Sequence, residues 1–238
     1  MSAIFKRELR SLFSSPLAYL VLAVLFAISG YYFYLANMEF GYRSLNYVFS
    51  ALYSYACFLV LPILTMRLFS EEKRQKTDQA LFTAPVSLTG IVMGKFFAAF
   101  LVFLIGISIT LVFAVVMAAM TKIDPNWLSV FGNFIGLALY GGMLVAAGLF
   151  FSCLTESQLI AALCTFAFEL VLSSVNYLTT VFADNKFVET VVNFLSVSDR
   201  YSHFTAGAIH YGDIVFFLSM TALFIFLAVR VLDRKRWA

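Results

Sequence analysis

Charged residues are scarce in this sequence. Asp, Glu, Lys and Arg together make up 12% of its 238 residues, whereas 62% are hydrophobic. A soluble domain carries roughly 25% charged residues, so this chain has about half the charge needed to cover a water-facing surface. Its apolar residues also lie in long uncharged runs, which would aggregate in water but suit a bilayer. The composition therefore excludes an ordinary soluble domain and predicts an all-α integral membrane protein.

Cysteine and histidine are also rare, and their positions argue against a metal site. Cys57, Cys153 and Cys164 each stand alone in or beside an apolar run, without a CxxC pair. We interpret them as small core residues. The two histidines, His203 and His210, are seven positions apart and have no adjacent carboxylate or thiolate partner. We therefore expect no bound metal in this chain.

Six runs are long and apolar enough to cross a bilayer, which takes about 20 residues per helix. They cover about 16–36, 45–66, 96–120, 128–153, 159–182 and 213–232. The connection 183–211 has a helical apolar stripe, which predicts one or two short helices at the membrane surface or dipping into it. The chain is thus expected to form a single transmembrane domain with six spans.

A basic amphipathic segment precedes the first run. Within residues 2–14, Phe5 and Leu9 fall close to one helical face, while Lys6, Arg7 and Glu8 lie elsewhere. This pattern is typical of a helix that lies in the membrane interface and contacts lipid.

Lys and Arg are distributed unevenly between the two sides of the membrane. Three precede the first run, five lie in residues 67–95 and four lie at the C-terminal end; the opposite side has only Arg43, Lys122, Lys186 and Arg200. Because cytoplasmic loops are enriched in Lys and Arg, we expect both termini and the 67–95 loop in the cytoplasm. Residues 183–211 are then extracytoplasmic.

The most charged segment is 67–79, which follows the second run without a glycine or proline break. Glu71 and Glu72 precede most of its cations, and apolar residues return only at Leu81 and Phe82. A cytoplasmic helix that presents charge and then a hydrophobic knob suits docking in a groove on another protein. The alternative is a solvated helix beside the membrane that is attracted to anionic lipid.

One charge lies in the middle of a span. Glu169 sits in the fifth run, and Asn176 follows two helical turns later, close to the same face. An ionisable group at this depth is costly and usually faces a cavity or a partner. Two hypotheses stay open: a residue of the substrate pathway or of a proton-linked step, or a protonated, hydrogen-bonded packing residue.

The sequence has no recognisable catalytic or nucleotide-binding motif. Residues 90–95, GIVMGK, look superficially like a phosphate loop, but three residues separate the glycines instead of four. Phe96 also follows the lysine where Ser or Thr must hold magnesium. We therefore expect no enzyme activity in this chain.

The charged segment resembles that of a known family, the type-2 ABC exporter permeases, and within them the gliding-motility and nitrous-oxide-reductase-maturation permeases. That family typically has Arg, an apolar pair, acidic-Glu-Lys, then Gly-Thr-x-Glu-x-Leu-Leu-x-x-Pro; residues 67–86 here are RLFSEEKRQKTDQALFTAPV. Further matches are FKREL at 5–9, SP at 15–16 and LTESQ at 154–158. The departures are Lys76, Gln79 and Phe82, where the family usually has Gly, Glu and Leu.

The resemblance implies a six-span half-transporter of the type-2 ABC exporter fold. Residues 2–14 become its interfacial elbow helix, and 67–90 becomes a coupling segment between spans two and three. The residues that dock on a cytoplasmic ATPase are then expected to be Glu71, Glu72, Lys73, Arg74, Thr77, Leu81, Phe82 and Pro85. ATP and magnesium belong to that ATPase, and this chain needs no cofactor.

The expected function is therefore that of a permease subunit, in a bacterial cytoplasmic membrane, that exports a substrate with ATP hydrolysed by another chain. A second permease copy or homologue completes the pathway, and no nucleic-acid partner is expected. The Phe-rich spans favour an amphipathic cargo over a hydrophilic ion. The alternative is a six-span scaffold or accessory protein that transports nothing.

Overall fold

The computed structural model describes residues 2–76, 87–121, 125–181, 196–208 and 210–236, and all regular secondary structure in these ranges is helical. Five helices are long and apolar enough to cross a membrane: α2 (Pro16–Phe33) with its π-helical end η1 (Tyr34–Glu39), α7 (Leu88–Thr121), α8 (Trp127–Leu154), α9 (Gln158–Val181) and α12 (Tyr211–Arg236). A sixth span results if the bent pair that begins at Asn46 is counted as one. The all-helical membrane architecture predicted from the sequence is confirmed.

The second span, expected as one run over 45–66, is bent by 47°. It consists of α3 (Asn46–Ala51), the π-helical turn η2 (Leu52–Ala56) and α4 (Cys57–Thr65). A π-helical turn inserts one extra residue per turn, and Pro62 inside α4 has no N–H for the helical ladder. Both features are known causes of bends in helices, and apolar periodicity does not report either of them.

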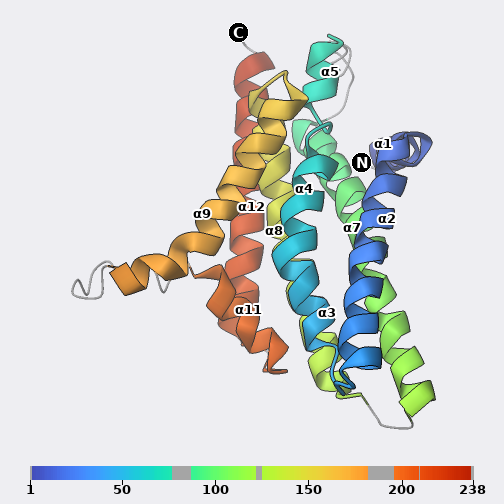
Figure 1. Cartoon of the computed structure of the whole chain (residues 1–238). Helices are drawn as coiled ribbons and strands as arrows, with labels where there is room; N and C mark the ends of the chain where they lie inside the picture. The colour runs from blue at the N-terminus through green and yellow to red at the C-terminus, as the bar shows by residue number, and fades with distance from the viewer. Residues whose placement is uncertain (1, 77–86, 122–124, 182–195, 209, 237–238) are drawn as a thin grey trace.

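The interfacial segment forms α1 (Ser2–Ser14), which joins α2 at a sharp corner (Figure 1). Ser15 has an extended backbone between the two helices, and Pro16 occupies the first position of α2. Proline disfavours helical geometry in the residue before it, so the sequence itself breaks the helix here. Leu12 is buried and α1 packs on α7 and α2.

The helix that contains the third span begins before the apolar run. We expected the span from residue 96, just after Lys95, and α7 already starts at Leu88 and includes Lys95 in its third turn. Residues 88–90, counted above in the coupling segment, therefore belong to the same helix as the third span. Carboxylates from two other helices neutralise Lys95 there.

α8 lies at the centre of the bundle and contacts α4, α7, α9, α12 and the short α11 (Val197–Thr205). In its apolar 18-residue stretch, 67% of the residues are buried, against 22–39% in the corresponding stretches of the other four long helices. Glycines make this close packing possible. A Cβ on Gly141 would overlap the ring of the fully buried Phe103 on α7, and one on Gly148 would overlap Thr65 on α4.

We predict that Gly141→Ala lowers the free energy of unfolding by about 1–2 kcal/mol, because the added methyl group overpacks a rigid core contact. Equilibrium unfolding in mixed detergent micelles, followed by circular dichroism, measures the change. Gly30→Ala is the matched control, since a Cβ there meets no atom within 4 Å. Adding Phe103→Leu to the Gly141 variant is expected to recover part of the loss. A Gly141 variant as stable as the control would contradict the packing argument.

Candidate functional site

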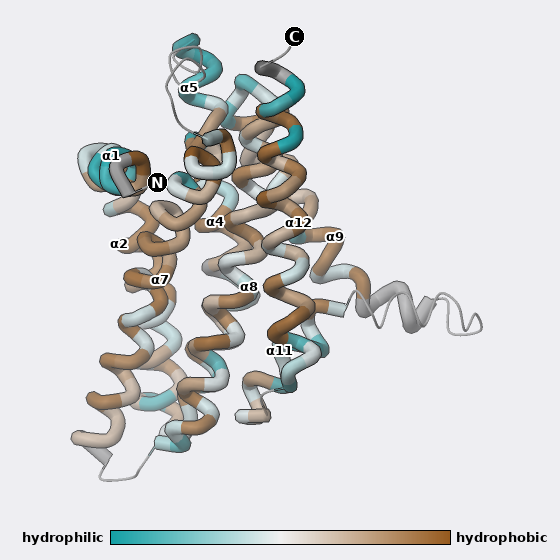
Figure 2. Tube along the Cα trace, turned by 180° about the vertical axis from the view of Figure 1, so that it is seen from behind, coloured by the Kyte–Doolittle hydropathy of each residue, from teal (hydrophilic) through white to brown (hydrophobic). Residues whose placement is uncertain are grey.

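A five-residue helix, α5 (Ser70–Arg74), stands at the end of the bundle where the chain leaves α4. The same end carries α1 and the last turns of α12 (Figure 1). Figure 2 shows hydrophilic residues gathered on α5, on part of α1 and at the end of α12, while the long helices are largely hydrophobic. This polar end contains several of the residues that the sequence predicted for docking.

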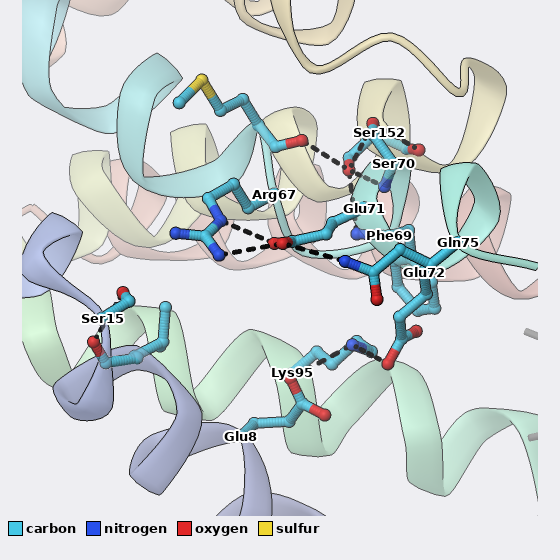
Figure 3. A network of polar contacts seen from close by, with 12 residues as sticks. Glu8, Ser15, Arg67, Phe69, Ser70, Glu71, Glu72, Gln75, Lys95 and Ser152 are labelled. Atoms are coloured by element: carbon cyan, nitrogen blue, oxygen red, sulfur yellow. Dashed lines mark hydrogen bonds and ion pairs between the residues drawn. The ribbon is translucent and has the colours of Figure 1, made fainter. Parts of the chain in front are cut away.

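The N-terminus of α5 is capped by a side chain from a distant helix. Ser152, near the end of α8, accepts hydrogen bonds from the backbone N–H groups of Phe69 and Ser70, both at 3.0 Å (Figure 3). The Ser70 hydroxyl donates to the Ser152 carbonyl oxygen at 3.2 Å. The first N–H groups of a helix have no partner within it. Ser152 supplies that partner and thereby fixes α5 to α8.

Lys73 holds α5 at a second point. Its buried ammonium donates to the carbonyl oxygen of Cys153 in the last turn of α8. Carbonyls at a helix C-terminus lack helical partners and carry partial negative charge, so a cation is favourable there. From the sequence, Lys73 was expected on the docking surface. The structure turns it inward instead, because α8 offers it an acceptor that no local pattern reveals.

Three helices meet at Lys95. Its ammonium lies 3.1 Å from Glu8 Oε2 on α1 and 2.9 Å from Glu72 Oε1 on α5, while Lys95 itself belongs to α7 (Figure 3). The side chain is only 1% exposed, and its ammonium also lies 4.9 Å from the centre of the Phe69 ring. Arg7 adds contacts at 2.6 Å to Glu8 and 3.3 Å to Glu72. We call Arg7, Glu8, Glu72 and Lys95 the ion-pair cluster.

In this cluster one buried ammonium, that of Lys95, neutralises two carboxylates. Glu8 and Glu72 would repel each other without the lysine between them, and a buried cation is costly without anions. The hydrogen bond to Glu8 raises the pKa of the Arg7 guanidinium above its ordinary value. The three helices are therefore joined by charge-assisted contacts that resist separation.

Glu71 belongs to a neighbouring local pair. Arg67 reaches its carboxylate from one turn earlier, with Nε 2.6 Å from Oε2 and Nη2 3.0 Å from Oε1, and Gln75 donates to Oε1 at 3.3 Å (Figure 3). A cavity of about 320 Å³ lies between this pair, the ion-pair cluster and α1. The polar end is thus a pre-arranged network rather than a set of free surface charges.

The predicted docking residues differ in their exposure. Arg74 is exposed, Glu71 and Glu72 are half-buried in internal pairs, and Lys73 is buried. The remaining predicted residues, Thr77, Leu81, Phe82 and Pro85, lie outside the described residues. Between residues 67 and 76, the exposed positions are 74–76.

The elbow residues behave as an amphipathic pattern requires, with one exception. Phe5 and Leu9 are half-buried and pack on the core, while Lys6 and Arg7 are exposed. Glu8 was expected away from the apolar face, but it is 9% exposed and points to Lys95.

The sequence reasoning missed Lys95 and Ser152. Lys95 did leave a signal, a single cation inside an otherwise uncharged stretch, which we took for the membrane edge. Ser152 left none, because a serine among apolar residues is common and its partners are 82 and 83 positions away.

Two other predicted residues lie in α9. The buried Glu169 accepts a hydrogen bond from the Tyr140 hydroxyl of α8 at 2.9 Å. Asn176 lies farther along the same helix, but its side chain is outside the described part of the structure. The two are therefore not shown to share a site.

His203 has a carboxylate partner that its sequence neighbours did not show. Asp213, buried at the start of α12, lies 2.8 Å from His203 Nδ1 and 2.8 Å from Arg200 Nη1. The His203 and His210 rings are 4.8 Å apart. Sequence adjacency did not reveal this contact, because α11 and α12 meet only in the folded chain. Within the described residues, no three His, Cys, Asp or Glu side chains are grouped so that they could hold a metal.

A family model described as ABC-2 family transporter protein matches residues 10–176. The match covers the first four apolar runs and most of the fifth, and it includes α5, Lys95 and Glu169. No protein of curated function matches the sequence.

Proposed function

The chain belongs to the ABC-2 family of transporter proteins, and on this premise we propose that it is the permease subunit of an exporter driven by a separate cytoplasmic ATPase. The alternative, a six-span scaffold without transport, is less well supported because the family is one of transport components. The 67–86 segment further favours the gliding-motility and nitrous-oxide-reductase-maturation permeases as the subfamily.

The proposal rests on one observation: α5, which lies in the coupling segment, is joined to three other helices by hydrogen bonds and ion pairs. α5 is joined to α8 through Ser152 and Lys73, and to α1 and α7 through Lys95. A force applied to its exposed end therefore reaches helices that cross the membrane. Rigid elements joined by such networks can transmit a two-state change, which an ATP-driven transporter requires.

The remaining parts of the proposal concern the assembly. We place both termini and α5 on the cytoplasmic side of a bacterial cytoplasmic membrane, where the ATPase and its ATP and magnesium are found. A second copy or homologue of this chain completes the transporter. The polar end fits this orientation, since α1, α5 and the end of α12 share it (Figure 1).

Charge reversal on the accessible surface of α5 is expected to weaken ATPase binding at least about tenfold, because charges at an interface set orientation and encounter rate. The test variant is Arg74→Glu/Lys76→Glu, since both side chains are exposed. Arg43→Glu is the matched control, exposed at the opposite end of the bundle. The measurement is co-purification of the tagged chain with the ABC ATPase of a neighbouring reading frame, followed by titration of the purified pair.

A second variant, Leu81→Ala/Phe82→Ala, tests the apolar part of the motif. If neither double variant weakens binding relative to Arg43→Glu, the coupling assignment fails. If the chain neither binds the ATPase nor stimulates its ATP hydrolysis, the permease proposal itself fails and the scaffold alternative gains.

A further inference from the structure

Glu169 is a buried carboxylate with one unused oxygen. It lies near the middle of α9 and is 1% exposed. Oε1 accepts the Tyr140 hydrogen bond, but Oε2 has no hydrogen-bond partner among the described residues. Nearly all buried polar atoms in proteins are paired, because an unpaired one costs about 1–3 kcal/mol. The unpaired oxygen of Glu169 therefore calls for an explanation.

A cavity opens beside this carboxylate. It has a volume of about 310 Å³ and is lined by Tyr53, Ser54, Phe58, Tyr140, Glu169, Leu170, Ser173 and Ser198. Ser54, Leu170 and Ser173 are exposed, whereas Glu169 and Tyr140 are buried. The accessible serines thus mark the open side, and the buried Glu169 lies on the inner side of the cavity.

A second cavity of about 430 Å³ adjoins the first and shares Tyr53, Ser54 and Ser198 with it. Its other walls come from the start of α3 and from α11, including Tyr201, whose buried hydroxyl also has no partner among the described residues. We call these two adjoining cavities, which lie between the bent second span, α9 and α11, the groove.

The aromatic walls are held in place by one another. The Tyr53 ring stacks on Tyr201 at 4.3 Å between centroids and lies against Tyr140 at 4.7 Å. The Tyr53 hydroxyl is 3.1 Å from Ser198 Oγ, which ties η2 to α11. Tyr53 and Ser54 both lie in η2, the π-helical turn at the bend of the second span.

This combination of groups selects one kind of ligand. An unpaired, desolvated carboxylate oxygen favours a positively charged donor, and a cation beside aromatic faces is stabilised further by their quadrupoles. The serine hydroxyls accept additional N–H donors. The volume of the first cavity suits a drug-sized molecule or part of one. An anionic or purely apolar cargo leaves Glu169 unpaired.

We propose that the groove is the substrate site of the transporter and takes amphipathic primary amines, with the ammonium on Glu169 and the apolar part against Tyr53, Phe58 and Tyr140. This inference rests on the proposed function, because the ligand is a substrate only if the chain is a transporter. The binding itself does not depend on the ATPase.

Dansylcadaverine is a suitable probe, because it carries a primary ammonium on an aromatic fluorophore that brightens in apolar surroundings. Its neutral partner is the dansyl sulfonamide with a pentyl chain, which lacks the terminal primary amine. Each probe is titrated into the full chain in lipid nanodiscs, with empty nanodiscs as the background. We expect saturable binding of dansylcadaverine and at least about tenfold weaker binding of the neutral probe, since a charge-assisted hydrogen bond is lost.

Glu169→Gln keeps the shape of the side chain and removes the charge. We expect it to weaken dansylcadaverine binding at least about tenfold and to change binding of the neutral probe less than about threefold. Glu156→Gln is the matched control, because Glu156 is exposed in the turn before α9 and lies away from the groove. Circular dichroism melting verifies that each variant is folded.

Equal affinity of the wild-type chain for the two probes overturns the proposal, and this comparison needs no variant. So does a folded Glu169→Gln chain that binds dansylcadaverine as the wild type does. Either result leaves the permease assignment standing, because that assignment is tested by ATPase binding. Loss of ATPase binding with normal probe binding would contradict the proposed function instead.

Discussion

Replacing Lys95 with methionine is expected to lower the free energy of unfolding by about 3–5 kcal/mol. The ammonium is buried and lies within 3.1 Å of carboxylates from two other helices. Methionine keeps most of the volume but leaves Glu8 and Glu72 facing each other without the ammonium between them, and Arg7, which contacts both, is exposed. Removing one partner of a buried ion pair is more damaging than removing the whole pair, because it strands a charge in a poorly solvated place.

Equilibrium unfolding in mixed micelles measures this change, with Lys6→Met as the matched control, since Lys6 is exposed on the same end of the molecule. A triple variant, Lys95→Met with Glu8→Gln and Glu72→Gln, removes all three charges and should recover most of the loss. If the single variant is as stable as the control, the cluster is not a structural junction. If the triple variant recovers nothing, the loss comes from packing rather than charge.

Ser152→Ala is expected to release α5 from α8. Two buried backbone N–H groups, of Phe69 and Ser70, lose their acceptor, and the Ser70 hydroxyl loses one neighbour. At about 1–2 kcal/mol for each stranded N–H, the free energy of local opening should fall by about 2–4 kcal/mol. Amide hydrogens at residues 69–73 should then exchange roughly 30-fold faster or more, because each 1.4 kcal/mol is a factor of ten.

Hydrogen exchange read by mass spectrometry follows this segment directly. Ser108→Ala is the control, because its hydroxyl bonds only to the Ile105 carbonyl of its own helix. Exchange in α8 and α12 should be unchanged, which separates local release from global unfolding. ATPase binding should weaken in parallel if α5 is the docking element. Unchanged protection of residues 69–73 would mean that Ser152 does not hold the helix.

The sequence predicted the architecture well because each membrane span is determined by one continuous stretch of residues. About 20 apolar residues in a row must cross a bilayer as a helix, whatever the rest of the chain does. The α1–α2 corner was equally local, since Pro16 alone excludes a continuous helix. The bend in the second span was missed, since a π-helical turn leaves no mark in the hydropathy pattern.

The candidate site was predicted only in part. The docking role of the 67–86 segment stays a prediction, and Arg74 is exposed as that prediction requires. Lys73 and Glu8 were assigned to exposed faces, but both are buried with partners. A cation or carboxylate looks like a surface residue in the sequence, because its counter-charge is contributed by another helix.

By itself, the sequence determined that this protein is a helical membrane protein, where most spans lie, and that residues 67–86 resemble an ABC permease motif. Only the tertiary structure decided which charges are free and which are paired. Lys95 and Glu8, which form an ion pair, are 87 positions apart in the sequence. Tyr140 and Glu169, which share a hydrogen bond, are 29 positions apart. Hydropathy and helical periodicity act over one or two turns, whereas a buried charge is stabilised by whatever group the folded chain brings within about 3 Å.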